Sequence, residues 1–173
     1  MTEIDESPVV SASAPKLLQF KKKETVSART GKPVVVLVED EKPVRDMITA
    51  QLKSLGFDVQ SFDDGLPAAD YFKSGGYAEL LITDMKMPGM LGNDLVRAVK
   101  NDERTKTIPV IAMSAFDKDL RAPLVKDYVD VRTLDKPYRL AELRALIQEL
   151  IKLPEEPVSN NEEEGALQER EIT

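Results

Sequence analysis

The sequence feature that most constrains the fold is a short apolar run that ends on a carboxylate. Residues 80–84 read Leu-Leu-Ile-Thr-Asp, and Pro88-Gly89 follow four residues later. The run has the length of a buried strand, and the Pro-Gly pair stops that strand and begins a turn. Asp84 is therefore predicted at the carboxyl end of a strand. There it is either the N-cap of a following helix or a reactive group, and this segment alone leaves both readings open.

Composition removes several classes of function. The chain has 173 residues with neither Cys nor His, which excludes disulfides, zinc–thiolate sites, histidine ligands, catalytic triads and a phosphohistidine on this chain. The formal net charge of -7 argues against a nucleic-acid-binding surface. No apolar run approaches the roughly 20 residues that span a bilayer, and the first residues lack the basic start of a secretory signal. We therefore expect a cytoplasmic protein with no membrane insertion.

Two terminal segments flank one predicted domain. Residues 1–32 contain Pro8 and Pro15, the basic cluster 21–23 and no sustained periodicity, which predicts a flexible N-terminal arm. Residues 154–173 are rich in Glu, Asn, Ser and Pro, which predicts an acidic, disordered C-terminal tail. The folded domain is predicted over residues 33–153.

Strand and helix patterns alternate through this domain. The strands, rich in apolar and β-branched residues, are predicted at 33–38, 57–62, 79–84, 108–113 and 128–134. Helical spacing of apolar residues predicts helices over 42–55, through 68–72, and over 91–100, 118–127 and 139–153. The fourth helix is the weakest because Pro123 lies inside it. Five such repeats predict a doubly wound α/β fold with a five-stranded parallel sheet.

Polar and charged residues follow the predicted strands. Glu39 and Asp40 end the first strand, Asp84 the third, Ser114 the fourth, and Lys136 follows the fifth. In a doubly wound sheet the carboxyl ends of the strands share one edge, and ligands bind there. Taken singly, each of these residues also has a non-functional interpretation. Glu39-Asp40 suits a solvated turn, Ser114 a helix cap and Lys136 a surface position. Because all of them are predicted at one edge of the sheet, a functional site is favoured over these separate interpretations.

The chemistry of this edge follows from its residue types. If the first and third strands are neighbours, three carboxylates come within a few ångströms, and they cannot all remain ionised unless a cation is shared among them. An oxygen-only set of ligands suits Mg²⁺. Lys136 and the Ser114 hydroxyl would lie opposite the metal, where they are suited to bind the oxygens of a phosphoryl group on Asp84.

These motifs, in this order over residues 33–153, resemble a receiver domain of two-component response regulators, of the stand-alone, CheY-like kind. The resemblance implies a (βα)5, flavodoxin-like fold with strand order 2-1-3-4-5. It implies that Asp84 accepts a phosphoryl group from a sensor histidine kinase or a histidine phosphotransfer protein. It also implies site roles for the other residues: Asp40 and Asp84 as direct Mg²⁺ ligands, Glu39 through water, the Lys86 backbone carbonyl as a further ligand, and Ser114 and Lys136 as phosphoryl contacts.

The chain also departs from the family pattern. Members usually carry an aromatic residue three positions before the Lys, where this chain has Thr133, and residues 121–130 lack the small turn common before the fifth strand. Neither terminal segment is long or apolar enough to fold as an output domain. We therefore predict a single-domain response regulator that switches its binding to an unidentified downstream protein.

Two other functions are compatible with parts of this pattern. The alternative to a phosphorylation switch is a phosphorylation-independent pseudo-receiver that acts as a protein-docking module, which Thr133 suggests. An Asp-dependent phosphatase on a similar sheet would need a second Asp two residues after the nucleophile, and Lys86 stands there. We therefore expect no turnover enzyme acting on an external substrate.

Overall fold

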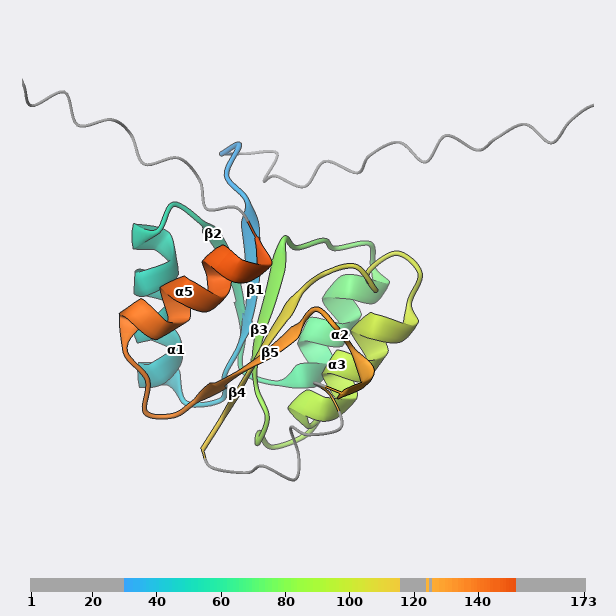
Figure 1. Cartoon of the computed structure of the whole chain (residues 1–173). Helices are drawn as coiled ribbons and strands as arrows, with labels where there is room; N and C mark the ends of the chain where they lie inside the picture. The colour runs from blue at the N-terminus through green and yellow to red at the C-terminus, as the bar shows by residue number, and fades with distance from the viewer. Residues whose placement is uncertain (1–29, 116–123, 125, 152–173) are drawn as a thin grey trace, which may run out of the picture.

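A computed structural model describes residues 30–115, 124 and 126–151 of the chain, in which strands and helices alternate (Figure 1). The strands are β1 (Val34–Val38), β2 (Asp58–Phe62), β3 (Leu80–Asp84), β4 (Val110–Ser114) and β5 (Val131–Asp135). The helices are α1 (Lys42–Ser54), α2 (Gly65–Lys73), α3 (Gly92–Asn101) and α5 (Leu140–Leu150). The helix predicted over 118–127 lies largely outside the described residues.

The five strands form one parallel sheet in the order β2-β1-β3-β4-β5. This order confirms the predicted doubly wound α/β fold. It places β1 and β3 side by side, with Val38 opposite Thr83, so the residues that follow both strands emerge together. On the other side of β3, Asp84 lies opposite Met113 of β4.

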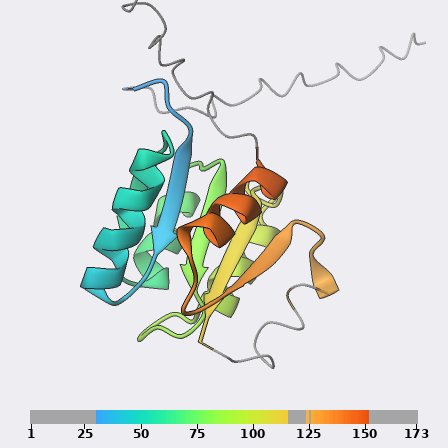
Figure 2. The same cartoon turned by 60° about the vertical axis from the view of Figure 1, so that its left-hand side comes forward.

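Helices cover both faces of the sheet (Figures 1 and 2): α1 and α5 lie on one face, and α2 and α3 on the other. The alternation of side chains along β1 supplies both cores. Val35 and Leu37 pack in the cluster that contains residues of α1 and α5, whereas Val36 and Val38 pack in the cluster that contains residues of α2 and α3. Burial on both faces explains why β1 reads as an unbroken apolar run.

The prediction that the fifth strand starts at Tyr128 is wrong. The Tyr128 amide donates to the Leu124 carbonyl at 3.0 Å, as at the end of a helix, and residues 129–130 form a turn with Val129 91% exposed. The strand begins only at Val131, whose amide donates back to the Tyr128 carbonyl. Tyr and Val have high strand propensity, but the local hydrogen bonds decide the conformation here.

Two apolar residues on predicted helix faces are exposed. Met47 of α1 is 48% exposed, while Ile48 and Leu52 of the same helix are fully buried against the sheet. Leu140 is 41% exposed in the first turn of α5, whose buried residues are Leu143 and Ile147. A helix buries only the stripe that faces the sheet, so these neighbouring positions reach solvent.

The predicted arm and tail lie outside the described residues, apart from residues 30–32 of the arm. Within the described part of the chain, every helix is too short or too polar to cross a bilayer.

Candidate functional site

Asp84 is the last residue of β3 and is buried, with 8% of its surface exposed. Its Oδ1 accepts a hydrogen bond from the Lys86 amide at 3.0 Å. The next helix, α3, has Leu91 at its N-cap, seven residues further on, so of the two interpretations that the sequence leaves open for Asp84, the helix N-cap is excluded. The Asp84 carboxylate is left to interact with groups from other strands.

Glu39 and Asp40 directly follow β1, next to β3 in the sheet. Glu39 is fully buried, and Asp40 is partly exposed. The turn that carries them is fixed by Arg45 of α1, whose Nη1 donates to the Glu39 carbonyl at 2.6 Å and to the Asp40 carbonyl at 3.1 Å. No pattern of residue types predicts this contact, because Arg45 bonds the backbone rather than a side chain.

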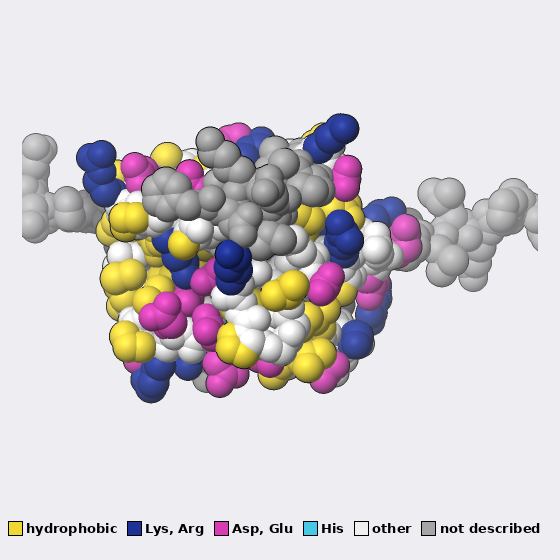
Figure 3. Space-filling model, turned by 90° about the horizontal axis from the view of Figure 1, so that it is seen from below, with side chains coloured by type: hydrophobic (Ala, Val, Ile, Leu, Met, Phe, Trp, Pro, Cys, Tyr) yellow, Lys and Arg dark blue, Asp and Glu magenta, His cyan; other side chains and the backbone are white. Residues whose placement is uncertain are grey.

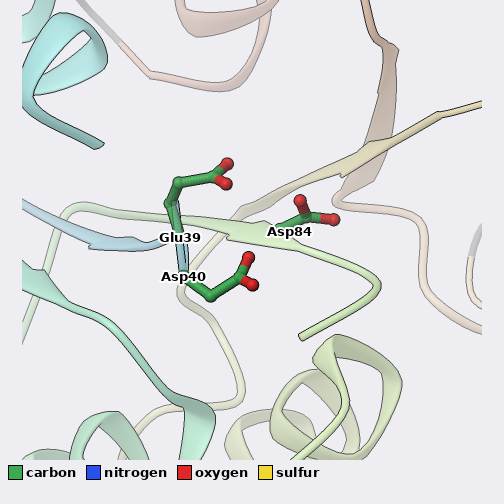
Figure 4. Close-up of side chains that lie close together, drawn as sticks. All are labelled: Glu39, Asp40 and Asp84. Carbon is green, nitrogen blue, oxygen red and sulfur yellow. The ribbon is translucent and has the colours of Figure 1, made fainter. Parts of the chain in front are cut away.

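The three carboxylates meet at the carboxyl edge of the sheet, as predicted from the topology (Figure 4). One oxygen each of Glu39, Asp40 and Asp84 lies within 4.8 Å of the others. Figure 4 shows the two residues that follow β1 on opposite sides of the strand end, with Asp84 facing them from β3. The space-filling view from this end of the sheet shows acidic and basic side chains close together on the surface (Figure 3). The neighbouring positions of β1 and β3 therefore create an acidic cluster from residues more than forty positions apart.

Lys136 links this cluster to β5. Its Nζ donates to Glu39 Oε2 at 2.7 Å and to Asp84 Oδ2 at 2.5 Å. Its backbone amide donates to the Ser114 carbonyl at 2.9 Å, so the end of β4 fixes the chain that carries it. The ammonium group therefore bridges two of the three acids.

The ionisation of the cluster reflects its burial. Burial raises the pKa of Glu39 above its ordinary value, and the hydrogen bond and charge of Lys136 offset this only in part. Burial alone would lower the pKa of Lys136, but its hydrogen bonds with Asp84 and Glu39 outweigh that effect and raise it. Lys136 is thus held as a cation, and burial disfavours the charged form of Glu39.

The residues of the cluster fit a divalent cation. Glu39 Oε1 is buried and has no hydrogen-bond partner among the described residues, which is costly for a carboxylate oxygen. One ammonium group for three carboxylates leaves a negative excess. The facing groups are all oxygens, the donor type that Mg²⁺ prefers. The Lys86 amide contact with Asp84 also brings the backbone of Lys86 beside the cluster.

Ser114 and Thr133 lie on the β4–β5 side of the site. Ser114 ends β4, one residue beyond Met113, the partner of Asp84, and is 1% exposed. Thr133 is half-buried in β5 opposite Ala112. The structure thus brings Glu39, Asp40, Asp84 and Lys136 into contact range and places Ser114 at the adjacent strand end.

Tyr138 is a residue near the site that the sequence reading did not single out. Its hydroxyl is buried with no hydrogen-bond partner among the described residues. Burial raises its pKa to about 12, and the neighbouring charges of Lys136 and Glu39 act on it in opposite directions. Its position directly after Lys136-Pro137 is the sequence feature that could have indicated that it lies near the site. The phenol is therefore neutral beside the Lys136–Glu39 pair.

Known proteins share both the sequence pattern and the fold. The family model described as response regulator receiver domain matches residues 35–148. The chemotaxis protein CheY of Pseudomonas aeruginosa is 42% identical over 85 residues, which are 49% of this chain and 68% of that protein. The two-component response regulator ORR5 of Oryza sativa subsp. japonica is 38% identical over 93 residues, 54% of this chain and 69% of that protein.

A solved structure shows the same architecture. It is the receiver domain of a sensor histidine kinase from Pseudomonas aeruginosa PAO1, with a TM-score of 0.61 and 26% identity over 69% of this chain and 97% of that one. That crystal structure holds a magnesium ion coordinated in its active-site cleft.

Proposed function

The chain belongs to the response regulator receiver domain family, and we propose that it is a single-domain response regulator whose Asp84 accepts a phosphoryl group in a Mg²⁺-dependent reaction. The donor is a sensor histidine kinase or a histidine phosphotransfer protein. The observation that carries this proposal is the position of Lys136, whose Nζ contacts both Asp84 and Glu39 beside the acidic cluster. The product changes binding to a downstream protein.

The proposed step is a transfer from nitrogen to oxygen. The N–P bond of the partner's phosphohistidine breaks, and a bond forms between phosphorus and an Asp84 carboxylate oxygen. The imidazole nitrogen keeps the electron pair of the broken bond and takes a proton from solvent. The phosphohistidine lies outside the 173 residues of this sequence, which contain no His.

Transfer of a phosphoryl group depends mainly on positioning and on neutralising the charge of its oxygens. Asp40 and Asp84 directly, Glu39 through water and the Lys86 carbonyl would hold Mg²⁺, which when bound supplies part of that neutralisation. Lys136 supplies the rest from this chain, since its ammonium already lies at the carboxylate that is modified.

The proposed output begins at Ser114. A phosphoryl group on Asp84 brings acceptor oxygens to the end of β3, and the Ser114 hydroxyl at the neighbouring strand end donates to one of them. This contact draws the end of β4 toward Asp84, so a local charge event biases a two-state surface.

A protein-docking module that does not use phosphorylation is the second candidate. Thr133 favours it, because this half-buried position in β5 carries no aromatic side chain that could turn between exposed and buried orientations. The two candidates differ in whether Asp84 is modified.

The test is to incubate the purified protein with acetyl phosphate and Mg²⁺ and to measure the intact mass. We expect one added phosphoryl group, which disappears in Asp84→Asn and without Mg²⁺. Asp70→Asn is the matched control, because Asp70 is exposed on α2 away from the cluster, and it should be modified like the wild type. A folded wild-type protein that stays unmodified with both acetyl phosphate and candidate kinases would favour the docking module.

A further inference from the structure

We propose that Asp64 is a positioning residue that holds the loop carrying the Lys86 carbonyl, an inference that rests on the Mg²⁺ site of the proposed function. Asp64 precedes α2 and belongs to neither the acidic cluster nor the phosphoryl contacts. Its carboxylate ties the start of α2 to residues 86–91, the loop between β3 and α3.

Two hydrogen bonds to one oxygen form this tie. Asp64 Oδ1 accepts from the Leu66 amide at 2.9 Å, which caps α2, and from the Met90 amide at 3.2 Å. The second bond joins residues 26 positions apart, so it is a tertiary contact rather than part of the cap. Both backbone hydrogen bonds lower the pKa of Asp64, the Leu66 bond more than the Met90 bond. The acceptor is therefore an ionised carboxylate at neutral pH.

Two glycines allow this close approach. Gly89 has φ +77°, and a Cβ there would lie 2.2 Å from Asp64 Oδ2. A Cβ on Gly65 would lie 2.8 Å from the Met90 carbonyl oxygen. At Gly65 the backbone of α2 thus meets the backbone of the loop, and at Gly89 the backbone of the loop meets the Asp64 carboxylate, so a side chain at either position would disturb the contact.

The opposite end of the loop is fixed at the site itself. The Lys86 amide donates to Asp84 Oδ1 at 3.0 Å, and the Gly92 amide donates to the Met85 carbonyl at 3.3 Å. Lys86 therefore lies between an anchor at Asp84 and an anchor at Asp64. Release of the second anchor removes the tertiary hydrogen bond that holds the loop beyond Lys86, and metal ligands that lose such support bind more weakly.

Burial of Met87 is a competing explanation for the order of this loop. Its side chain is 5% exposed and belongs to the core cluster under α2 and α3. If that packing alone holds the loop, removal of the Asp64 contact leaves Mg²⁺ binding unchanged. The experiment must therefore separate the hydrogen bond to Met90 from both helix capping and packing.

Three substitutions make this separation. Asp64→Asn keeps an acceptor oxygen in the same place without the charge. Asp64→Ser keeps a good N-cap for α2, but its shorter side chain does not reach the Met90 amide. Asp64→Ala loses both contacts. Asp63→Ala is the matched control, because Asp63 is the exposed neighbour with the same charge and no contact to the loop among those described.

The measurements are Mg²⁺ affinity by calorimetry and hydrogen exchange of the Met90 amide by NMR, on the full chain. We expect Asp64→Ser and Asp64→Ala to bind Mg²⁺ about tenfold more weakly and to exchange the Met90 proton faster. Asp64→Asn should stay within about threefold of the wild type, the effect of a lost charge at a kept hydrogen bond. Asp63→Ala should match the wild type.

Folded Asp64→Ser that binds Mg²⁺ as tightly as Asp63→Ala would overturn the inference, whatever its Met90 exchange. Failure of the proposed function gives a different result: the wild type itself would show no Mg²⁺ binding. In that case faster Met90 exchange in Asp64→Ser would still show the tie, but its role in positioning a metal ligand would be refuted.

Discussion

Two lysines are largely buried at opposite ends of the sheet, and their partners differ in a way that separates structure from function. Lys100, at the end of α3, donates to the carbonyls of Lys106 and Ile108 at 3.1 and 2.7 Å and to Asp130 at 2.6 Å. Lys136 donates to two carboxylates of a cluster that still contains an unpartnered oxygen, Glu39 Oε1.

The two lysines differ in whether their partners leave an uncompensated charge. The three hydrogen bonds of Lys100 match the three donors of an ammonium group, and among the described residues its charged partner is the single carboxylate of Asp130. This pair joins α3 to the turn before β5 and leaves no charge for a ligand. At Lys136 the acids outnumber the cation. A buried lysine whose charge and hydrogen bonds are fully matched thus stabilises the fold, whereas a cluster with more carboxylates than ammonium groups attracts a further cation.

The largest expected effect tests the structural lysine. Lys100→Met leaves Asp130 and two carbonyls without their donor, and we expect the free energy of unfolding to fall by about 3 kcal/mol in urea denaturation. Lys136→Met should cost less than half as much, because Glu39 can take up a proton in its place. Equal losses of unfolding free energy in the two variants would contradict the distinction between a structural Lys100 and a functional Lys136.

A smaller effect tests whether the acidic cluster beside Lys136 binds Mg²⁺. Mg²⁺ at ten times its dissociation constant should raise the free energy of unfolding by about 1.4 kcal/mol, since it binds only the folded state. Lys100→Met should keep this increment although it is less stable, and Asp84→Asn should lose most of it. An increment that survives in Asp84→Asn would place the ion elsewhere.

The smallest effect concerns Glu39 without metal. Glu39→Gln should raise the free energy of unfolding at pH 7 by about 1 kcal/mol, the usual size of a single-residue effect, because it removes a buried charge that the fold disfavours. Its Mg²⁺ affinity should fall. Glu41→Gln, at an exposed position that makes no side-chain cap for α1, is the control and should change neither quantity.

The sign of the pH dependence of this gain follows from the raised pKa of Glu39. A group whose pKa is higher in the folded state stabilises fully below its unfolded value, 4.5, and loses that contribution as the pH rises through the folded value. The advantage of Glu39→Gln should therefore shrink as the pH falls toward 4.5. An advantage that grows on acidification would contradict the assignment.

The parts of the fold that the sequence predicted are those whose signal is local. β1, β3 and β4 are buried on both faces and read as apolar runs. Strand order came from the family resemblance, because periodicity does not say which strands pair. The start of β5 cannot be predicted from residue types, because the turn at residues 129–130 has strand-like residues before and after it. The hydrogen bonds from Tyr128 to Leu124 and from Val131 to Tyr128 define the turn.

The site divides in the same way. Glu39, Asp40, Asp84 and Lys136 could be predicted because strand ends of a parallel sheet share an edge, so topology alone brings them together. The contacts of Arg45 with two carbonyls and of Asp64 with the Met90 amide could not, since neither leaves a pattern in residue types. Supporting contacts through the backbone require the folded chain.

The separation of the site residues along the chain has a consequence for biosynthesis. Lys136 meets Glu39 across 97 residues and Asp84 across 52. A nascent chain whose first three strands have emerged presents the acids without their cation, and closing so long a loop is among the later steps of folding a sheet of this kind. The Lys136 contacts therefore form only after β5 has been synthesised and has joined the sheet, and a truncated chain that lacks β5 would keep the acidic residues without the ammonium that completes the site.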